Sequence, residues 1–155
     1  MFEWLEMTSV ALWVGESLWG YPIMLALHAV GLAIVVGIFV MRDLRLMGFF
    51  EGISYESLDS LRNLGWIGFL INAISGCFLF SSQATMFIES TPFLLKISMI
   101  FLAAICAAVL QNKSHAEAVQ WDASGAATGG VRSLAMLSTA LWIGAIISGR
   151  LVAYI

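Results

Sequence analysis

Few residues of this sequence could do chemistry, and three of them stand alone inside long apolar stretches. They are His28, Lys96 and Arg150. A histidine imidazole is a common ligand of metal ions and of haem iron. Lysine and arginine side chains bind carboxylates and other anions. These residue types therefore predict a ligand for a metal or haem, together with a site for anionic groups.

The composition indicates whether these side chains lie in a membrane or in a soluble domain. The chain has 155 residues, of which 61% are hydrophobic and 11% are charged, and its mean hydropathy is +0.94. Soluble domains are about half apolar and about a quarter charged. A chain of this length forms one domain, and so small a fold cannot hide this much apolar surface from water. We therefore expect a single integral membrane domain over residues 1–155. With 7 basic and 10 acidic residues and no basic patch, no nucleic-acid partner is expected.

Four apolar stretches are long enough to cross a bilayer, since a transmembrane helix needs about 20 residues. They cover approximately residues 18–41, 63–85, 92–111 and 133–155. Helices are expected because a helix satisfies its own backbone hydrogen bonds in lipid. The predicted fold is thus all-α: an integral membrane four-helix bundle with an N-terminal interfacial helix over residues 1–15. Thr91, followed by Pro92, is the expected cap of the third helix.

The basic residues predict an orientation. Those outside the spans flank the first and third connections: Arg42, Arg45, Arg62, Lys113 and Arg132. Because basic loops stay in the cytoplasm, both termini are expected on the periplasmic side of a bacterial inner membrane. Residues 1–15 contain no Lys or Arg, so no cleaved signal peptide is expected. Residues 112–131 are expected to form a polar cytoplasmic loop, whose second half is made flexible by Gly125, Gly129 and Gly130.

The polar residues within the spans concentrate in the outer half of the bundle. With about 1.5 Å of rise per residue, His28 lies on the order of 15 Å below the outer boundary. Asn72 and Trp142 fall at a similar depth, and Lys96 and Arg150 lie within about two turns of the outer ends of their helices. Polar residues at such positions are costly and usually face the bundle interior. The sequence therefore places one imidazole deep in the bundle, with two cations above it.

Each of these positions has a functional and a structural interpretation. His28 is either a ligand of haem iron or copper, or an imidazole that ties helices together through Asn72 or a backbone carbonyl. Gly31, one turn further on, leaves room beside it for a flat ring or for another helix. Lys96 and Arg150 either bind haem propionates or a substrate carboxylate, or extend to the outer headgroups.

Parts of the sequence resemble known families. Residues 90–96 (STPFLLK) resemble part of the membrane domain of copper resistance protein D. Residues 27–48 (LHAVGLAIVVGIFVMRDLRLMG) and 142–155 (WIGAIISGRLVAYI) resemble a set of uncharacterised bacterial four-helix membrane proteins. A histidine in the first span and a lysine opening the third are similar to the HemJ-type protoporphyrinogen oxidases. That resemblance implies haem b binding that depends on His28 and Lys96.

The first hypothesis is a haem-b-binding membrane protein in electron transfer, or in oxidation of a porphyrin or quinol. His28 would be the axial ligand, Lys96 and Arg150 would meet the propionates, and Gly31 and Trp142 would shape the cavity for the ring. A helical bundle builds cofactor sites between its facing helices in this way.

Two alternatives remain open at this stage. One is a copper-handling protein that uses His28 and Met99 as ligands, since thioethers suit copper. The other is an accessory or structural subunit of a larger membrane complex, or of a homo-oligomer, in the lipid bilayer. Hydrolytic and phosphoryl-transfer enzymes are disfavoured, because the sequence has no HExxH, CxxC, GxSxG or glycine-rich phosphate loop.

Overall fold

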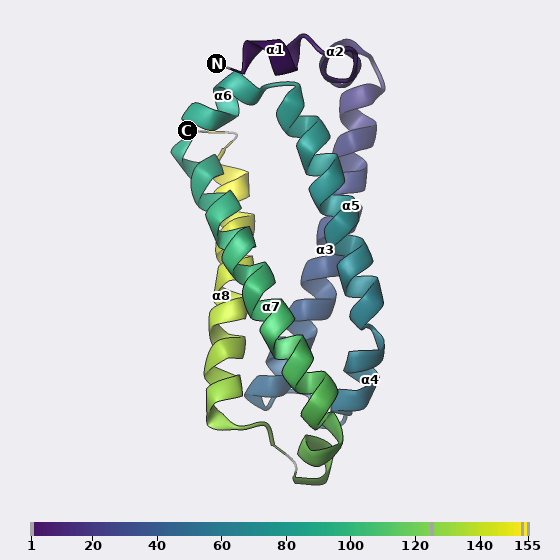
Figure 1. Cartoon of the computed structure of the whole chain (residues 1–155), viewed down its shortest axis with the longest axis vertical. Coiled ribbons are helices and arrows are strands. Elements are labelled where there is room, and N and C mark those ends of the chain that lie inside the picture. Colours follow the sequence, from purple (N-terminus) through teal and green to yellow (C-terminus); the bar gives the residue numbers. More distant parts are fainter. Residues whose placement is uncertain (1, 125, 153, 155) are drawn as a thin grey trace.

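All regular structure is helical in the part of the chain that the computed structural model describes, residues 2–124, 126–152 and 154 (Figure 1). The helices are α1 (Glu3–Glu6), α2 (Ser9–Glu16), α3 (Gly20–Met47), α4 (Tyr55–Ser60), α5 (Arg62–Ser81), α6 (Ala84–Glu89), α7 (Thr91–Ser124) and α8 (Gly129–Leu151). Four of these helices, α3, α5, α7 and α8, are long and apolar enough to cross a membrane. The prediction of an all-α fold with four such helices is therefore confirmed.

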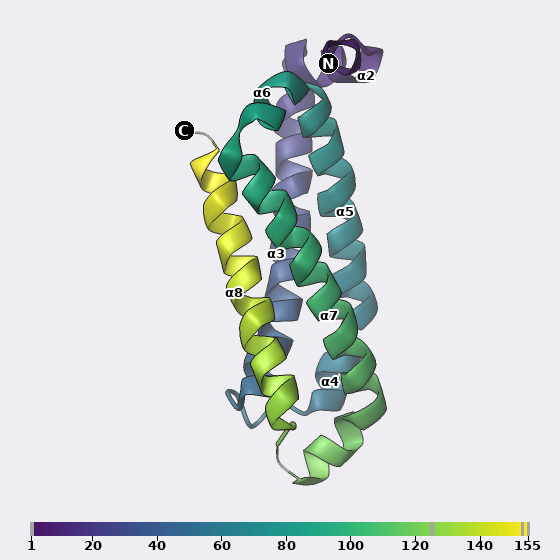
Figure 2. The same cartoon turned by 60° about the vertical axis from the view of Figure 1, so that its left-hand side comes forward.

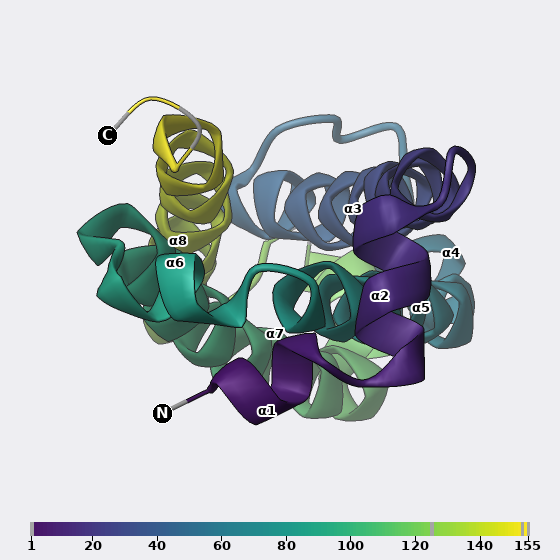
Figure 3. The same cartoon turned by 90° about the horizontal axis from the view of Figure 1, so that it is seen from above.

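The four long helices form two pairs. α3 packs along α5 and α7 packs along α8, and contacts between α3 and α8 join the pairs. α1, α2 and α6 cover one end of the bundle, here called the α2 end, whereas α4 lies at the other, the α4 end (Figures 1 and 2). Seen from above the α2 end, α2 lies across the ends of α3 and α5 (Figure 3).

The N-terminal segment differs from the single interfacial helix expected over residues 1–15. It breaks into α1 and α2 because Thr8 leaves the helical conformation and caps α2, its hydroxyl accepting from the Ala11 N–H at 3.3 Å. The Glu6 carboxylate accepts from the Thr85 N–H at 2.7 Å, which joins α1 to α6. At the start of α7, the hydroxyl of Ser90 accepts from the Phe93 N–H at 3.4 Å, so Ser90 takes the capping role expected of Thr91.

The polar stretch 112–131 is not a loop over most of its length. α7 continues through it to Ser124, because Ser114, Ala118 and Trp121 recur at helical spacing and are buried. The ring of Trp121 packs edge-on against Tyr55 of α4, with their centroids 5.7 Å apart. The expectation of a loop is thus wrong for residues 112–124, since small and aromatic residues on one face pack this segment against the bundle.

The bundle is packed most closely towards the α4 end. One core cluster there contains Leu46, Tyr55, Leu110, Ala118, Trp121, Ala127, Val131 and Ala135, and a second contains Val35, Phe39, Ala103, Ala107 and Trp142. Towards the α2 end, by contrast, α7 has no buried residue before Ala103. Apolar side chains such as Val30 and Leu95 are exposed in that half, as expected of helices that face lipid.

Candidate functional site

The side chain of His28 is held by α5. Its Nδ1 lies 2.9 Å from the backbone oxygen of Asn72 and 3.3 Å from the hydroxyl of Ser75. A carbonyl oxygen only accepts, so Nδ1 carries the proton and donates it, which in the neutral ring makes Nε2 the nitrogen with the free lone pair. None of the described residues forms a hydrogen bond with Nε2. This is the tautomer in which a histidine ligates a metal through Nε2.

A second hydrogen bond runs back from α5 to α3. The side-chain amide of Asn72, which is buried, donates to the backbone oxygen of His28 at 2.8 Å. The bond from the imidazole of His28 to the backbone oxygen of Asn72 is the interhelical bond that the sequence left as an alternative. Such a bond also orients histidines that ligate metals, so it serves either interpretation.

Glycines allow α3 and α5 to approach closely around this histidine. A Cβ on Gly31 would lie 2.6 Å from the backbone nitrogen of Asn72 and 2.9 Å from the oxygen of Gly68. The space beside Gly31 is therefore filled by the backbone of α5. Of the two occupants considered, a flat ring or another helix, the structure has the helix. A Cβ on Gly76 would lie 3.1 Å from Cε1 of His28, so one edge of the imidazole rests on that glycine.

Lys96 lies near the α2 end of α7 and packs against α8, the other helix of its pair. Its half-buried side chain crosses Gly149 of α8, where an added Cβ would be 3.1 Å from Lys96 Cδ and 3.5 Å from Nζ. Lys96 and His28 both lie in the half of the bundle near the α2 end, although they come from different helix pairs.

Arg150 is turned along its own helix. It is exposed, and its Nη2 donates to the Tyr154 hydroxyl at 2.8 Å while the guanidinium group lies 5.2 Å from the centroid of that ring. It follows Gly149 directly, so its backbone is adjacent to the contact with Lys96. The structure therefore brings Arg150 near the predicted anion site, but its side chain is bound to Tyr154.

Trp142 lies deeper in the bundle than His28. It is 2% exposed and belongs to the core cluster with Phe39, whose ring centroid is 6.0 Å away. Phe39 follows His28 by about 16 Å along α3. Counting residues from the helix ends predicted a similar depth for Trp142 and His28. The packing of Trp142 against Phe39 places it nearer the α4 end. The indole Nε1 is buried without a hydrogen-bond partner among the described residues.

Met99 packs between α7 and α8. The hydroxyl of Ser148 donates to its sulfur at 3.9 Å, and a Cβ on Gly144 would be 2.8 Å from that sulfur. Because His28 faces α5 instead, these contacts turn the two ligands of the copper hypothesis towards different helices. In the described residues no cluster of three or more His, Cys, Asp or Glu side chains could hold a metal ion.

A buried charge cluster at the end of α3 was not expected from the sequence. Arg42 and Arg45 were expected to be loop charges, but both are buried with Asp43, which is 0% exposed. Arg42 donates to Asp43 Oδ1 at 2.7 Å from Nη2 and 3.1 Å from Nε, and to the backbone oxygen of Ala107 at 3.1 Å from Nη1. The guanidinium group of Arg45 lies 4.0 Å from the centroid of the Tyr55 ring.

These contacts extend α3 past residue 41, where the predicted span ends, and tie its end to α4 and α7. A signal for them was present in the sequence: an acidic residue lies directly beside a basic one at the boundary of a span, which allows the two to enter the bundle as a neutral pair.

Comparisons with family models, curated proteins and solved structures find no match to this chain. The class of the protein therefore rests on its fold and composition. It is an all-helical chain with four helices suited to cross a membrane.

Proposed function

We propose that this protein is embedded in a bacterial inner membrane and binds haem b through Nε2 of His28. The observation that supports the proposal most directly is the hydrogen bond from His28 Nδ1 to the Asn72 carbonyl, at 2.9 Å. It fixes the tautomer and the ring orientation that an axial ligand requires. The resemblance of His28 and Lys96 to the histidine and lysine of HemJ-type oxidases supports the same assignment.

The orientation in the membrane is part of this proposal. Lys113 is exposed towards the α4 end, where Arg62 is the first residue of α5 and Arg132 lies in the first turn of α8. Under the positive-inside rule this end faces the cytoplasm. The α2 end, with α1 and α2 lying across it, then faces the periplasm. His28 belongs to the periplasmic half of the bundle.

Two of the five predicted cofactor residues fit haem directly. His28 offers Nε2, and the ammonium group of Lys96 is placed to pair with a propionate carboxylate. Arg150 would exchange Tyr154 for a second propionate at the surface. Gly31 and Trp142 serve the packing of the bundle: Gly31 is closed by α5, and Trp142 belongs to the core below. When bound, haem supplies one-electron chemistry.

The residues of this chain then have defined tasks in electron transfer, or in oxidation of a porphyrin or quinol. Asn72 and Ser75 hold the imidazole against rotation, Gly76 makes room for its edge, and Lys96 anchors an anionic group near the α2 end. Copper binding is not proposed, because Met99 packs against α8 whereas the imidazole of His28 is held by α5.

The test is an absorption spectrum of the purified protein, oxidised and then reduced with dithionite, after growth with added haem. We expect a Soret band and sharpened reduced bands that are lost in His28→Ala. His115→Ala is the matched control, since the chain contains only these two histidines and His115 is exposed.

Circular dichroism and size-exclusion chromatography of each variant separate loss of haem from loss of fold. A colourless wild-type protein, or a His28→Ala variant that keeps the full spectrum, would overturn the proposal. The first result would favour the role of accessory subunit, which predicts that the protein co-purifies with larger partners.

A further inference from the structure

The connection between α3 and α4 exposes two large apolar side chains. Phe49 and Phe50, which follow the last turn of α3, are 58% and 53% exposed and belong to neither core cluster. Seen from above the α2 end, this connection runs along the outer side of α3, away from α5, and projects beyond the helices (Figure 3). The two phenyl rings therefore lie at the rim of the bundle.

The backbone of this connection is held at both ends. The N–H groups of Gly48 and Phe49 donate to carbonyls in the last turns of α3, both at 3.0 Å, with Gly48 in the left-handed region at φ +103°. Further on, Arg45 donates from Nε to the Ile53 carbonyl at 2.6 Å, and the Ile53 N–H donates to the Phe50 carbonyl at 3.0 Å. A fixed turn thus presents the two rings.

Phe50 adopts a backbone conformation that most side chains avoid. Its φ is +55°, and it is the one non-glycine residue with a positive φ in the part of the chain that the structure describes. This conformation is disfavoured for a bulky residue, whereas glycine adopts it freely. The ring gains little from the chain itself, because the residue is more than half exposed. This combination points to a contact outside the chain.

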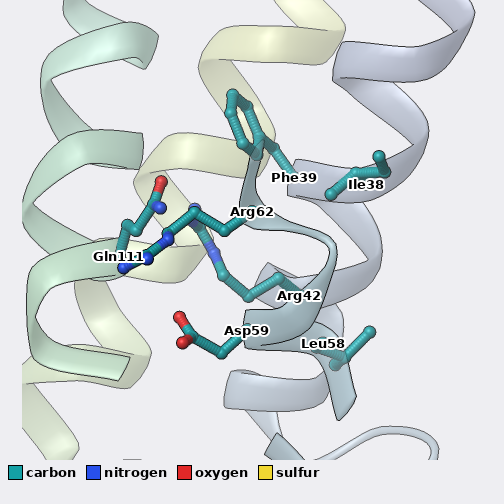
Figure 4. Close-up of a pocket in the computed structure, with 7 residues that line it drawn as sticks. All are labelled: Ile38, Phe39, Arg42, Leu58, Asp59, Arg62 and Gln111. Atoms are coloured by element: carbon teal, nitrogen blue, oxygen red, sulfur yellow. The ribbon is translucent and has the colours of Figure 1, made fainter. Parts of the chain in front are cut away.

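Polar groups mark the level at which this connection lies. Asp59, Arg62 and Gln111 gather at the α4 end around a pocket of about 10 Å³, which has room for a single water (Figure 4). Beyond this level α7 continues past α4 (Figures 1 and 2). The apolar surface of the bundle therefore gives way to water near α4. The connection leads directly into α4, so its two rings lie at this boundary.

The length of α3 indicates what the rings meet there. Its 28 residues rise about 42 Å, which is close to the thickness of a bilayer with its headgroup regions, about 40–45 Å. At the α2 end, Leu18 and Trp19 precede α3 and are even more exposed than the two phenylalanines. An exposed apolar pair thus lies at each end of a helix that is as long as a bilayer is thick. The two leaflets of a membrane account for this spacing.

We propose that residues 48–53 form a membrane anchor that inserts Phe49 and Phe50 into the leaflet at the α4 end, beside α3. The rings enter the boundary between headgroups and acyl chains, as the apolar residues of interfacial helices do. Glu51 and Gly52, which are exposed at the tip of the turn, stay among the headgroups. The partner is the lipid surface itself. The inference rests on the membrane embedding in the proposed function and is independent of haem.

The experiment is photocrosslinking of the full-length protein in phosphatidylglycerol nanodiscs, with benzoylphenylalanine in place of Phe50. This residue keeps the phenyl group and, on irradiation, bonds to C–H groups within reach, and mass spectrometry identifies the adduct. The same residue at Leu70, exposed within the apolar run of α5, should give lipid adducts. At Val119, exposed on the part of α7 that follows Lys113, it should give few.

Burial of one phenyl ring in lipid favours the inserted state by about tenfold or more, so we expect the lipid adduct at position 50 to exceed that at position 119 by about tenfold. Phe49→Ser removes the neighbouring ring and should lower the adduct at position 50 several-fold. Glu51→Gln, at the tip of the same turn, should leave it unchanged. Circular dichroism checks that each variant is folded.

A yield at position 50 no higher than at position 119 would overturn the proposal. A crosslink from position 50 to a second copy of the chain in place of lipid would do the same, as would equal yields in Phe49→Ser and Glu51→Gln. In each of these cases position 70 still labels lipid. Absence of lipid adducts at position 70 would contradict the membrane embedding, and the anchor with it, so the two failures are distinct.

Discussion

His28 and Asn72 are joined across α3 and α5 by two hydrogen bonds that run in opposite directions. The imidazole of His28 donates to the backbone oxygen of Asn72, and the side-chain amide of Asn72 donates to the backbone oxygen of His28. The side chain of each residue thus donates a hydrogen bond to the backbone of the other. The helix pair is fixed in rotation and in register at the depth where the imidazole lies.

The first prediction concerns this reciprocal pair. Asn72→Ala removes the bond to the His28 carbonyl but keeps the carbonyl that orients the imidazole. We expect the free energy of unfolding to fall by about 1 kcal/mol, the usual worth of a hydrogen bond between membrane helices. Unfolding in mixed detergent micelles measures it. Asn63→Ala, at an exposed position of the same helix, should change the value by less than about 0.5 kcal/mol. Equal effects of the two variants would contradict the structural role of Asn72.

The second prediction concerns the close approach of α3 and α5 at Gly31. In Gly31→Ala the new methyl group meets the backbone of Asn72 and Gly68, which cannot rotate away. We expect a loss of about 1–3 kcal/mol in the free energy of unfolding, as for other overpacked sites.

Gly37→Ala is the matched control for Gly31→Ala. It lies on the same helix, and a Cβ there meets nothing within 4 Å. This variant should be neutral or stabilising by up to about 1 kcal/mol, since alanine favours helices. A Gly31→Ala variant as stable as Gly37→Ala would contradict the close contact between the backbones of α3 and α5. Thermal unfolding in detergent compares the pair.

The third prediction concerns the buried ion pair of Arg42 and Asp43. Asp43→Asn leaves the arginine charge buried without its counter-charge, so we expect a loss of about 3–5 kcal/mol. Replacing both residues by leucine removes both charges and should restore much of that loss. Thermal unfolding of Asp43→Asn and of the double leucine variant measures both changes in stability. A double variant less stable than Asp43→Asn would show that the pair contributes more than mutual neutralisation.

The fourth prediction concerns the link between the N-terminal segment and α6. Glu6→Ala removes the carboxylate that accepts from the Thr85 N–H. We expect hydrogen exchange of the Thr85 amide to accelerate several-fold, because the loss of one hydrogen bond is worth about 1 kcal/mol. Glu3→Ala, an exposed acidic residue of the same short helix, should leave that amide unchanged. Identical exchange in wild type and Glu6→Ala would exclude this contact in solution.

Properties that depend on local composition could be predicted from the sequence. Long apolar runs determine that the chain is helical and suited to a membrane, because lipid leaves the backbone no other way to satisfy its hydrogen bonds. The rarity of polar residues in those runs is enough to single out His28, Asn72 and Lys96. The helical segment 112–124 could not be recognised in the same way, because the residues of its buried face include Ser114 and Ala118, which carry little hydrophobic signal.

Only the tertiary structure decided which neighbour each side chain meets. A helix that is apolar nearly all round has no hydrophobic face, so its sequence does not reveal its rotation about its own axis. That rotation turns His28 to α5, turns Met99 to α8, and brings the backbone of α5 against Gly31. It also carries Arg42 and Asp43 into the bundle as a neutral pair. These outcomes depend on how the side chains of different helices fit together, and that fit is a property of the assembled bundle.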